Sequence, residues 1–252
     1  MINNPHIKPL LQNCGQTYLP ADVYRSIHHR LWPGDFRRYQ KIRNAKVLDS
    51  DTYSLQPFIE RKAIFVHLPK CAGISVAKAL FGCPGGAHRT IRDYRIIFTD
   101  AEFRSFFKFT FVRNPWDRLV SAYFFLRDGG INEFDHRDAD ETVNKYQSFD
   151  DFVRKFFRTD DYYRFLHIKP QYTFLTMKNN GPILVDYVGR FETLDRDFEY
   201  ITNKIGKSTD LKKHNVSKKR ENINYQDFYD DETRQIVANA YARDISLFGY
   251  KF

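Results

Sequence analysis

The chain has 252 residues, with 40 Lys and Arg against 31 Asp and Glu and a formal net charge of +9. Hydrophobic residues make up 42% and aromatic residues 17%, which excludes a disordered chain and allows one α/β domain with a substantial core. The basic charge favours an anionic ligand, but no basic-aromatic RNA motif, zinc spacing or heptad repeat indicates nucleic acid.

Residues 1–62 form a mixed segment rich in His and Arg. Its prolines are expected to interrupt any long element: Pro5, Pro9, Pro20, Pro33 and Pro57. Residues 23–32 could form a short helix within it. We expect this segment to be an arm that packs on the domain formed by residues 63–252, although the start of the arm could also be disordered.

The first strong pattern is an apolar, β-prone run over residues 63–68 that ends in the loop Pro69-Lys70-Cys71-Ala72-Gly73-Ile74-Ser75. A helical pattern over residues 76–81 follows at once. Strand, tight loop and helix start together predict an anion cradle, to which Lys70 adds a charge and Ser75 a hydroxyl. A nucleoside-triphosphate loop would place its lysine after the last glycine, whereas Lys70 precedes Gly73. The pattern therefore favours a phosphate-like ligand over triphosphatase chemistry.

A second strand and helix follow a Gly-rich loop over residues 82–94 and a helix over 101–106. The apolar run 107–112 predicts a buried strand, and residues 116–127 predict a helix that begins near Pro115. Arg113 therefore lies at the carboxyl end of a strand, where ligands bind in open α/β sheets. Ser121 falls about two turns into the helix. A guanidinium and a hydroxyl placed in this way suit a phosphate monoester.

The remaining elements alternate strand and helix. Residues 128–144 are charged and contain glycine, which predicts a surface loop and a candidate flap over the ligand, while 149–157 predict an amphipathic helix capped near Ser148 or Asp150. A turn at 179–182 leads into a strand over 185–191, and helices are expected at 194–205 and 231–247. Alternation of this kind predicts an α/β fold, a mostly parallel sheet flanked by helices, as in the P-loop kinases.

These motifs carry a resemblance to a known family. The segment 69–75 resembles the 5′-phosphosulfate loop of sulfotransferases, and Arg113-Asn114-Pro115 with Arg118 and Ser121 resembles their 3′-phosphate signature. The best match is the carbohydrate sulfotransferase family, Golgi-type and bacterial (sulfotransferase family 2). It extends over about 63–252 and includes the segments 188–194 and 244–250. Ile74 departs from it, because members commonly carry Thr there; the lost hydroxyl is worth about 1 kcal/mol of donor binding.

The resemblance implies an enzyme that moves a sulfonate group from 3′-phosphoadenosine 5′-phosphosulfate (PAPS) to a hydroxyl of a carbohydrate, a polysaccharide or a glycolipid. Adenosine 3′,5′-bisphosphate is the product, and no metal is required. The arm 1–62 lies outside the resemblance and could help to shape the acceptor site. The implied cofactor-binding residues are Lys70, Cys71, Ala72, Gly73, Ile74, Ser75, Arg113, Ser121, Ser217 and Lys218.

Lys70 is expected to stabilise the leaving phosphate and the transferring sulfonate, and a second group must accept the hydroxyl proton. We choose His88, because its segment is similar to the histidine stretch that supplies the base in related hexuronic-acid sulfotransferases, and because imidazole accepts protons near neutral pH. His67 and Glu192 are rival bases. Gln171 could contact the adenine or the acceptor, and His214 begins a late basic loop that could close over the donor.

Two other functions remain open at this stage. A small-molecule kinase with a degenerate phosphate loop would need Mg²⁺ and an aspartate at a strand end. A non-catalytic basic module would bind acidic glycans or nucleic acid and would not depend on Lys70 or His88.

The sequence also carries signals of compartment. It contains neither a secretory signal nor an apolar run of 18 residues, so a natural chain beginning at Met1 would be cytoplasmic and bacterial. A trimmed eukaryotic chain would belong to the Golgi lumen. Cys14, Cys71 and Cys83 have no metal-ligand spacing, and their odd number fits a reducing compartment.

Overall fold

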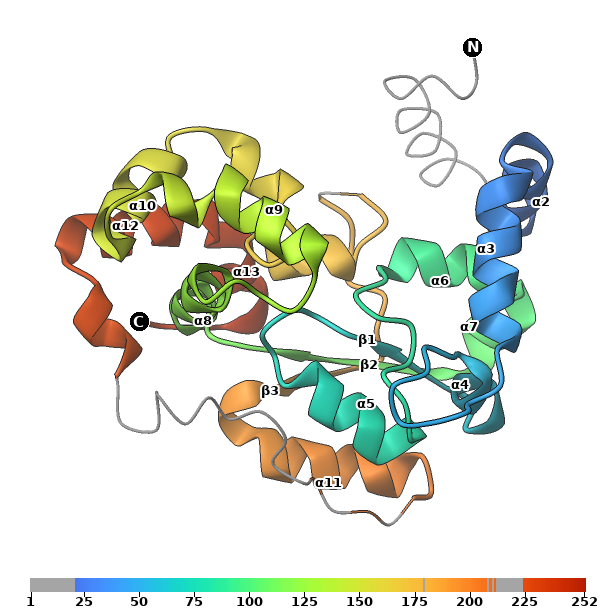
Figure 1. Cartoon of the computed structure of the whole chain (residues 1–252). Helices are drawn as coiled ribbons and strands as arrows, with labels where there is room; N and C mark the ends of the chain where they lie inside the picture. The colour runs from blue at the N-terminus through green and yellow to red at the C-terminus, as the bar shows by residue number, and fades with distance from the viewer. Residues whose placement is uncertain (1–20, 179, 208, 210, 212–223) are drawn as a thin grey trace.

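A computed structural model of the chain describes residues 21–178, 180–207, 209, 211 and 224–252 (Figure 1). Three strands form one parallel sheet in the order β1 (Ala63–Val66), β2 (Phe107–Val112), β3 (Tyr187–Arg190). The register pairs Ala63 with Phe107 and Phe109 with Tyr187. The predicted α/β fold, a parallel sheet flanked by helices, is therefore confirmed.

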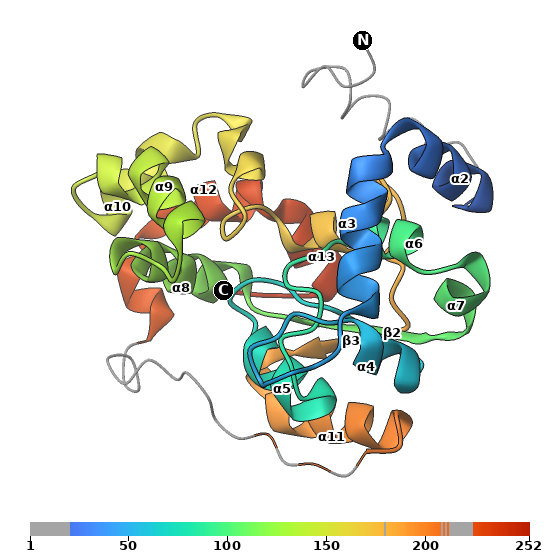
Figure 2. The same ribbon diagram turned by 45° about the vertical axis from the view of Figure 1, so that its right-hand side comes forward.

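Helices surround this sheet. In chain order the α-helices are α2 (Ala21–Leu31), α3 (Pro33–Asn44), α4 (Gln56–Glu60), α5 (Gly73–Phe81), α6 (Ile91–Ile97), α7 (Asp100–Ser105), α8 (Pro115–Arg127), α9 (Glu133–Glu141), α10 (Phe149–Phe156), α11 (Leu194–Lys204), α12 (Asp231–Ala240) and α13 (Ala242–Phe248). Short 3₁₀ turns include η2 (Asp160–Arg164), η3 (Gln171–Phe174), η4 (Phe191–Thr193) and η6 (Tyr225–Phe228). Figures 1 and 2 show α5 and α11 together on one face of the sheet, and α8, α10 and α12 gathered at the far side of the molecule from α2 and α3.

The apolar side chains form two clusters. The first surrounds the sheet, where Phe65, Phe109 and Phe111 are at most 1% exposed and pack with the inner face of α5. The second lies among α8, α10 and α12 and includes Tyr123 and Phe152. Because α8 follows β2 directly, this second cluster fixes the helix that starts at the carboxyl end of the central strand.

The described part of the N-terminal arm, from Ala21 onward, packs beside α6 through polar contacts. The Arg25 side chain donates to the carbonyl of Ile96 at 3.0 Å, and the Tyr39 hydroxyl donates to Asp93 at 2.8 Å. Pro33 interrupts the arm as expected: α2 ends at Leu31, and Pro33 lies in the first turn of a separate helix, α3, where a missing N–H costs nothing and the fixed φ suits the helix.

Three sequence predictions are wrong in detail. Residues 128–144 contain α9 rather than a simple surface loop, because the Asn132 side chain caps the helix by accepting the N–H groups of Phe134 and Asp135. The loop predicted over 82–94 ends early, because the Thr90 side chain caps α6. The helix predicted over 231–247 is interrupted at Tyr241, where α12 ends and α13 begins.

Candidate functional site

The loop after β1 presents backbone N–H groups at a helix start. Lys70 and Ala72 both adopt left-handed backbone angles, with φ of 66° and 59°, conformations that cost a non-glycine residue energy and gather at functional sites. Ala72 is the N-cap of α5, and its methyl side chain makes no capping hydrogen bond. In contrast, the side chain of Asn114 caps α8, the helix after the neighbouring strand. Backbone N–H groups at an N-terminus without a capping side chain at the N-cap position suit an anion.

Gly73 is required at this turn because the imidazole of His67 lies against it. A Cβ atom at position 73 would fall 1.7 Å from Cδ2 of His67. His67 itself is 5% exposed and stacks on Phe65 with an angle of 9° between the two rings. Packing against a buried ring therefore sets the position of the loop.

We expect Gly73→Ala to destabilise the chain by about 1–3 kcal/mol, or several degrees in melting temperature, because a buried ring must move to admit the methyl group. Gly34→Ala is the matched control, since a Cβ atom there meets nothing within 4 Å. It should leave the melting temperature unchanged or raise it slightly. Differential scanning calorimetry measures both; equal melting temperatures for the two variants would contradict the packing argument.

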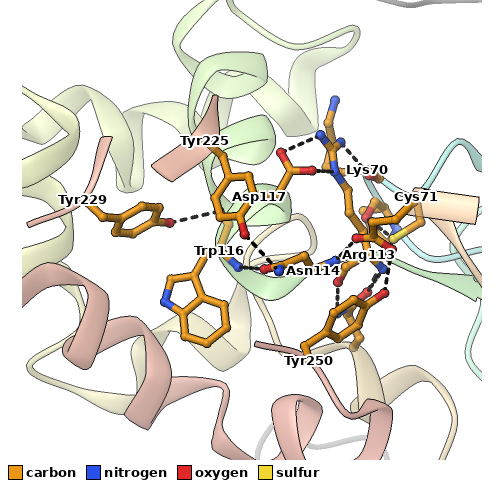
Figure 3. Close-up of polar contacts among 12 residues, drawn as sticks. Lys70, Cys71, Arg113, Asn114, Trp116, Asp117, Tyr225, Tyr229 and Tyr250 are labelled. Atoms are coloured by element: carbon orange, nitrogen blue, oxygen red, sulfur yellow. Dashed lines mark hydrogen bonds and ion pairs between the residues drawn. The ribbon is translucent and has the colours of Figure 1, made fainter. Parts of the chain in front are cut away.

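Arg113, at the end of β2, reaches the loop after β1 (Figure 3). Its Nη1 donates to the carbonyl of Lys70 at 3.2 Å, while Nε and Nη2 donate to the two carboxylate oxygens of Asp117 at 2.7 and 2.8 Å. The ring of Phe191 lies 4.1 Å from its guanidinium carbon. A guanidinium has five N–H groups, and the described residues accept three of them, so one on Nη1 and one on Nη2 are not used within this part of the chain, in a plane that Asp117 and Phe191 fix.

Ser121 lies one helical turn beyond Asp117 on α8 and is half-buried. Residues four apart in a helix share a face, so Ser121 lies on the face that carries the partner of Arg113. The geometry therefore allows Arg113 and Ser121 to approach one ligand.

Hydrogen bonds from two buried or partly buried polar side chains, Gln171 and Glu192, hold the backbone at the end of β2. The side-chain amide of Gln171 accepts the Arg113 N–H and donates to the Arg113 carbonyl, both at 2.9 Å. Glu192, after β3, accepts the backbone N–H of Asn114 at 2.6 Å and the hydroxyl of Tyr250 at 3.0 Å. Gln171 and Glu192 thus hold the strand ends together.

His88 is fixed at the start of the same loop. Its Nδ1 lies 3.1 Å from the carbonyl of His67, three residues before Lys70, and the two imidazole rings are 4.2 Å apart. Because a carbonyl oxygen only accepts, Nδ1 carries the proton, and Nε2 keeps the lone pair that a base needs. Burial, followed by the positive field of His167, lowers the pKa of His88 to about 4. His88 is therefore unprotonated at neutral pH.

Several side chains predicted for the site point elsewhere. The Cys71 thiol is 1% exposed and turned toward the Pro69 carbonyl and Gln171, and burial raises its pKa to about 12, so only the backbone of Cys71 can meet a ligand. Gln171 is fully buried, which removes it as a contact to adenine or acceptor. Both carboxylate oxygens of Glu192 already accept hydrogen bonds, which argues against its use as a base.

The described structure brings Lys70, Gly73, Ile74, Ser75 and the backbone of Ala72 into one loop, with Arg113 bonded to it and His88 attached at its start. His67 lies beneath this loop, with its side chain buried. Ser217, Lys218 and His214 lie outside the described residues.

Other residues of the site were not predicted from the sequence. Asp117 follows Arg113 by four residues, and this spacing could have indicated their ion pair. Phe125 lies under Lys70, whose Nζ is 3.9 Å from the ring centre, and Phe191 covers Arg113. Their aromatic types gave no signal, because most aromatic residues of this chain are core.

An open helix start after one parallel strand, with an arginine from the next strand bonded to it, is typical of α/β proteins that bind phosphorylated ligands. The sequence model of the Sulfotransferase family matches residues 60–251, and the chain therefore belongs to this family.

Two relatives bear on this assignment. Carbohydrate sulfotransferase 10 of Xenopus laevis is 28% identical over an alignment that covers 58% of this chain and 48% of that protein, so the match spans about half the length of the relative. An uncharacterized protein of Archaeoglobus fulgidus is 29% identical over 43% of this chain and 75% of its own length. No solved structure matches significantly.

The described residues hold neither a membrane-spanning helix nor a metal-binding cluster. No helix among them is long and apolar enough to cross a membrane. Within the same residues, no group of three or more His, Cys, Asp or Glu side chains is arranged to hold a metal ion.

Proposed function

We propose that this sulfotransferase takes its sulfonate from PAPS and that one pocket holds both ends of the donor. The 5′-phosphosulfate would bind the loop of Lys70 and the open start of α5, and the 3′-phosphate would bind Arg113 and Ser121. The observation that supports this proposal is the hydrogen bond from Arg113 to the Lys70 carbonyl at 3.2 Å, which brings the Arg113 guanidinium against the backbone of the loop that carries Lys70.

The chemistry follows from these positions. As the acceptor oxygen attacks sulfur, its proton passes to Nε2 of His88, the new O–S bond forms, and the bond between sulfur and the 5′-phosphate oxygen breaks. The charge that develops on the leaving phosphate is met by Lys70 and the N–H groups of α5. Adenosine 3′,5′-bisphosphate leaves, and His88 returns its proton to water.

A carbohydrate hydroxyl is the proposed acceptor. The name of the Xenopus laevis relative supports this class, and a net charge of +9 favours an acidic polysaccharide or glycolipid. The site requires only a hydroxyl that can reach His88 and the sulfonate together.

The buried position of His88 sets the expected pH dependence of transfer. A base needs its lone pair, so kcat/KM should fall only as the pH drops through the His88 pKa of about 4. We expect flat rates from neutral pH down to about 5.5, with no acid limb near 6.5, the ordinary histidine pKa. Rates of sulfonate transfer at constant ionic strength measure this profile, and a limb near 6.5 would point to a different, solvated base.

The stability of the folded chain should also fall as the pH drops. The pKa values of His67 and His88 are both lowered in the folded chain, His67 chiefly by burial, so the unfolded chain binds more protons. The contribution of the two neutral rings to the free energy of unfolding is fully present above their pKa in the unfolded chain. It is lost as the pH falls from about 6.5 toward 4.

A ligand screen by thermal shift tests the donor class. PAPS or adenosine 3′,5′-bisphosphate at 100 times its Kd should add about 2.7 kcal/mol, a rise of about 5–10 °C, with or without Mg²⁺. ATP or GTP with Mg²⁺ is the matched comparison, and a larger shift with these would favour a kinase. Transfer of labelled sulfonate from PAPS to a panel of oligosaccharides and acidic polysaccharides then tests the acceptor class.

A further inference from the structure

A second histidine, His167, lies behind His88 and is held by an aspartate. The ring centres of His88 and His167 are 5.9 Å apart, with a near-perpendicular angle of 78° between the rings. Nε2 of His167 lies 3.0 Å from Oδ1 of Asp135, and both residues are 5% exposed. No local sequence pattern indicates this pair, since its members are 32 residues apart, on α9 and in the segment before η3.

The pair is built into the fold from both sides. Asp135 also accepts the backbone N–H of Ile131 at 3.0 Å and packs against Gly130, where a Cβ atom would lie 2.2 Å from that of Asp135. The fully buried Arg118 donates to the backbone carbonyl of His167 at 3.0 Å. Arg118 lies in the first turns of α8, directly after Arg113. The start of α8 therefore orders both the predicted phosphate site and the segment that carries His167.

Among the described residues, Asp135 is the hydrogen-bond partner of the His167 ring. A carboxylate only accepts, so Nε2 of His167 is the donor, and Nδ1 is buried with no hydrogen-bond partner among the described residues. Burying a carboxylate and an imidazole costs more than an apolar filler of equal volume, so packing alone does not explain the pair. The ring of His167 connects the two candidate catalytic groups. It contacts His88 on one side and Phe125 on the other, with the Phe125 and His167 ring centres 4.8 Å apart, and Lys70 lies over the same Phe125 ring.

We propose that Asp135 and His167 form a positioning pair that holds the imidazole of His88 in the orientation and the neutral form that a base requires. This proposal rests on the proposed function for its catalytic meaning. The ring of His167 blocks rotation of His88 on one side, and the His67 carbonyl fixes Nδ1 on the other. The titratable and charged groups that act on His88 are His67, His167, Asp135 and Lys169.

The two members of the pair act on His88 in opposite directions, which makes the proposal testable without any donor. The field of His167 lowers the pKa of His88, and the field of Asp135 raises it. His167→Gln should therefore raise the His88 pKa above about 4, and Asp135→Asn should lower it. A merely structural pair would loosen the packing in both variants, admit water and raise the pKa in both.

Histidine side-chain NMR titration of the full chain measures this, with the His88 signal assigned from His88→Gln. His136→Gln and Asp140→Asn are the matched controls on α9, where both residues are exposed, and should leave the His88 titration unchanged. Should His167→Gln fail to fold, Asp135→Asn carries the test, because asparagine keeps an acceptor oxygen for His167. Shifts of the same sign in the two variants, or none in either, would overturn the proposal.

A kinetic arm distinguishes this proposal from the proposed function. With PAPS and a responsive acceptor, His167→Gln should lower kcat on the order of 10-fold, while the Kd for adenosine 3′,5′-bisphosphate stays unchanged. If the His88 pKa shifts in opposite directions in the two variants but the unmodified chain transfers no sulfonate, the positioning pair stands and the proposed function is rejected. Unchanged kcat in His167→Gln, with transfer intact, would reject the pair as a positioning device.

Discussion

Replacing His88 with asparagine should lower kcat for sulfonate transfer by about 10²–10⁴-fold, because the acceptor hydroxyl loses the group that takes its proton. Asparagine keeps an N–H donor for the His67 carbonyl near the position of Nδ1 and removes Nε2, so the loop of Lys70 should stay in place. The Kd for adenosine 3′,5′-bisphosphate should therefore remain that of the unmodified chain. Initial rates and calorimetry on the same preparations separate these two effects.

His136→Asn is the control for this experiment, because His136 is an exposed histidine on α9. It should change neither rate nor affinity. Unchanged turnover in His88→Asn would transfer the role of base to another group, whereas a joint loss of turnover and bisphosphate affinity would make His88 a structural support of the loop.

Lys70→Met should cost on the order of 10²–10³-fold in kcat, since the charge that develops on the leaving phosphate loses its nearest cation. Methionine keeps the length of the side chain and its contact with the ring of Phe125, so packing is preserved while the charge is removed. The affinity for adenosine 3′,5′-bisphosphate should also fall, because the 5′-phosphate binds in the same loop.

Lys78→Met is the matched control. Lys78 lies near the other end of α5 and pairs with Asp51, whose carboxylate is exposed. Exposed ion pairs contribute little, so this variant should keep its rate and its affinity. Similar losses in Lys70→Met and Lys78→Met would reflect the overall field of a basic protein rather than a specific contact.

Much of the fold was predictable because the strands carry a local signal. The apolar runs 63–68 and 107–112 end in Lys70 and Arg113, and parallel neighbours bring such ends to one edge of the sheet. The order of the two motifs along the chain and the family resemblance were enough to predict that they belong to one site. The contact between Arg113 and the Lys70 carbonyl then follows from the parallel register of β1 and β2.

What escaped prediction depends on contacts between distant residues. The sequence of α9 is too polar to reveal a buried face, yet it places Asp135 against a histidine from another segment. Gln171 and Glu192 are polar residues beside a predicted site, and nothing local distinguishes a ligand contact from a clamp between strand ends.

The central claim is that Lys70 and Arg113 hold opposite ends of one adenylate donor, and calorimetry with two nucleotides tests it most directly. Arg113→Ala should weaken adenosine 3′,5′-bisphosphate by about 10-fold or more and leave adenosine 5′-phosphate unchanged, because only the first carries a 3′-phosphate. Lys70→Met should weaken both nucleotides. If Arg113→Ala instead weakens the two equally, or neither, Arg113 only supports the loop through the Lys70 carbonyl, and the account of a shared pocket is contradicted.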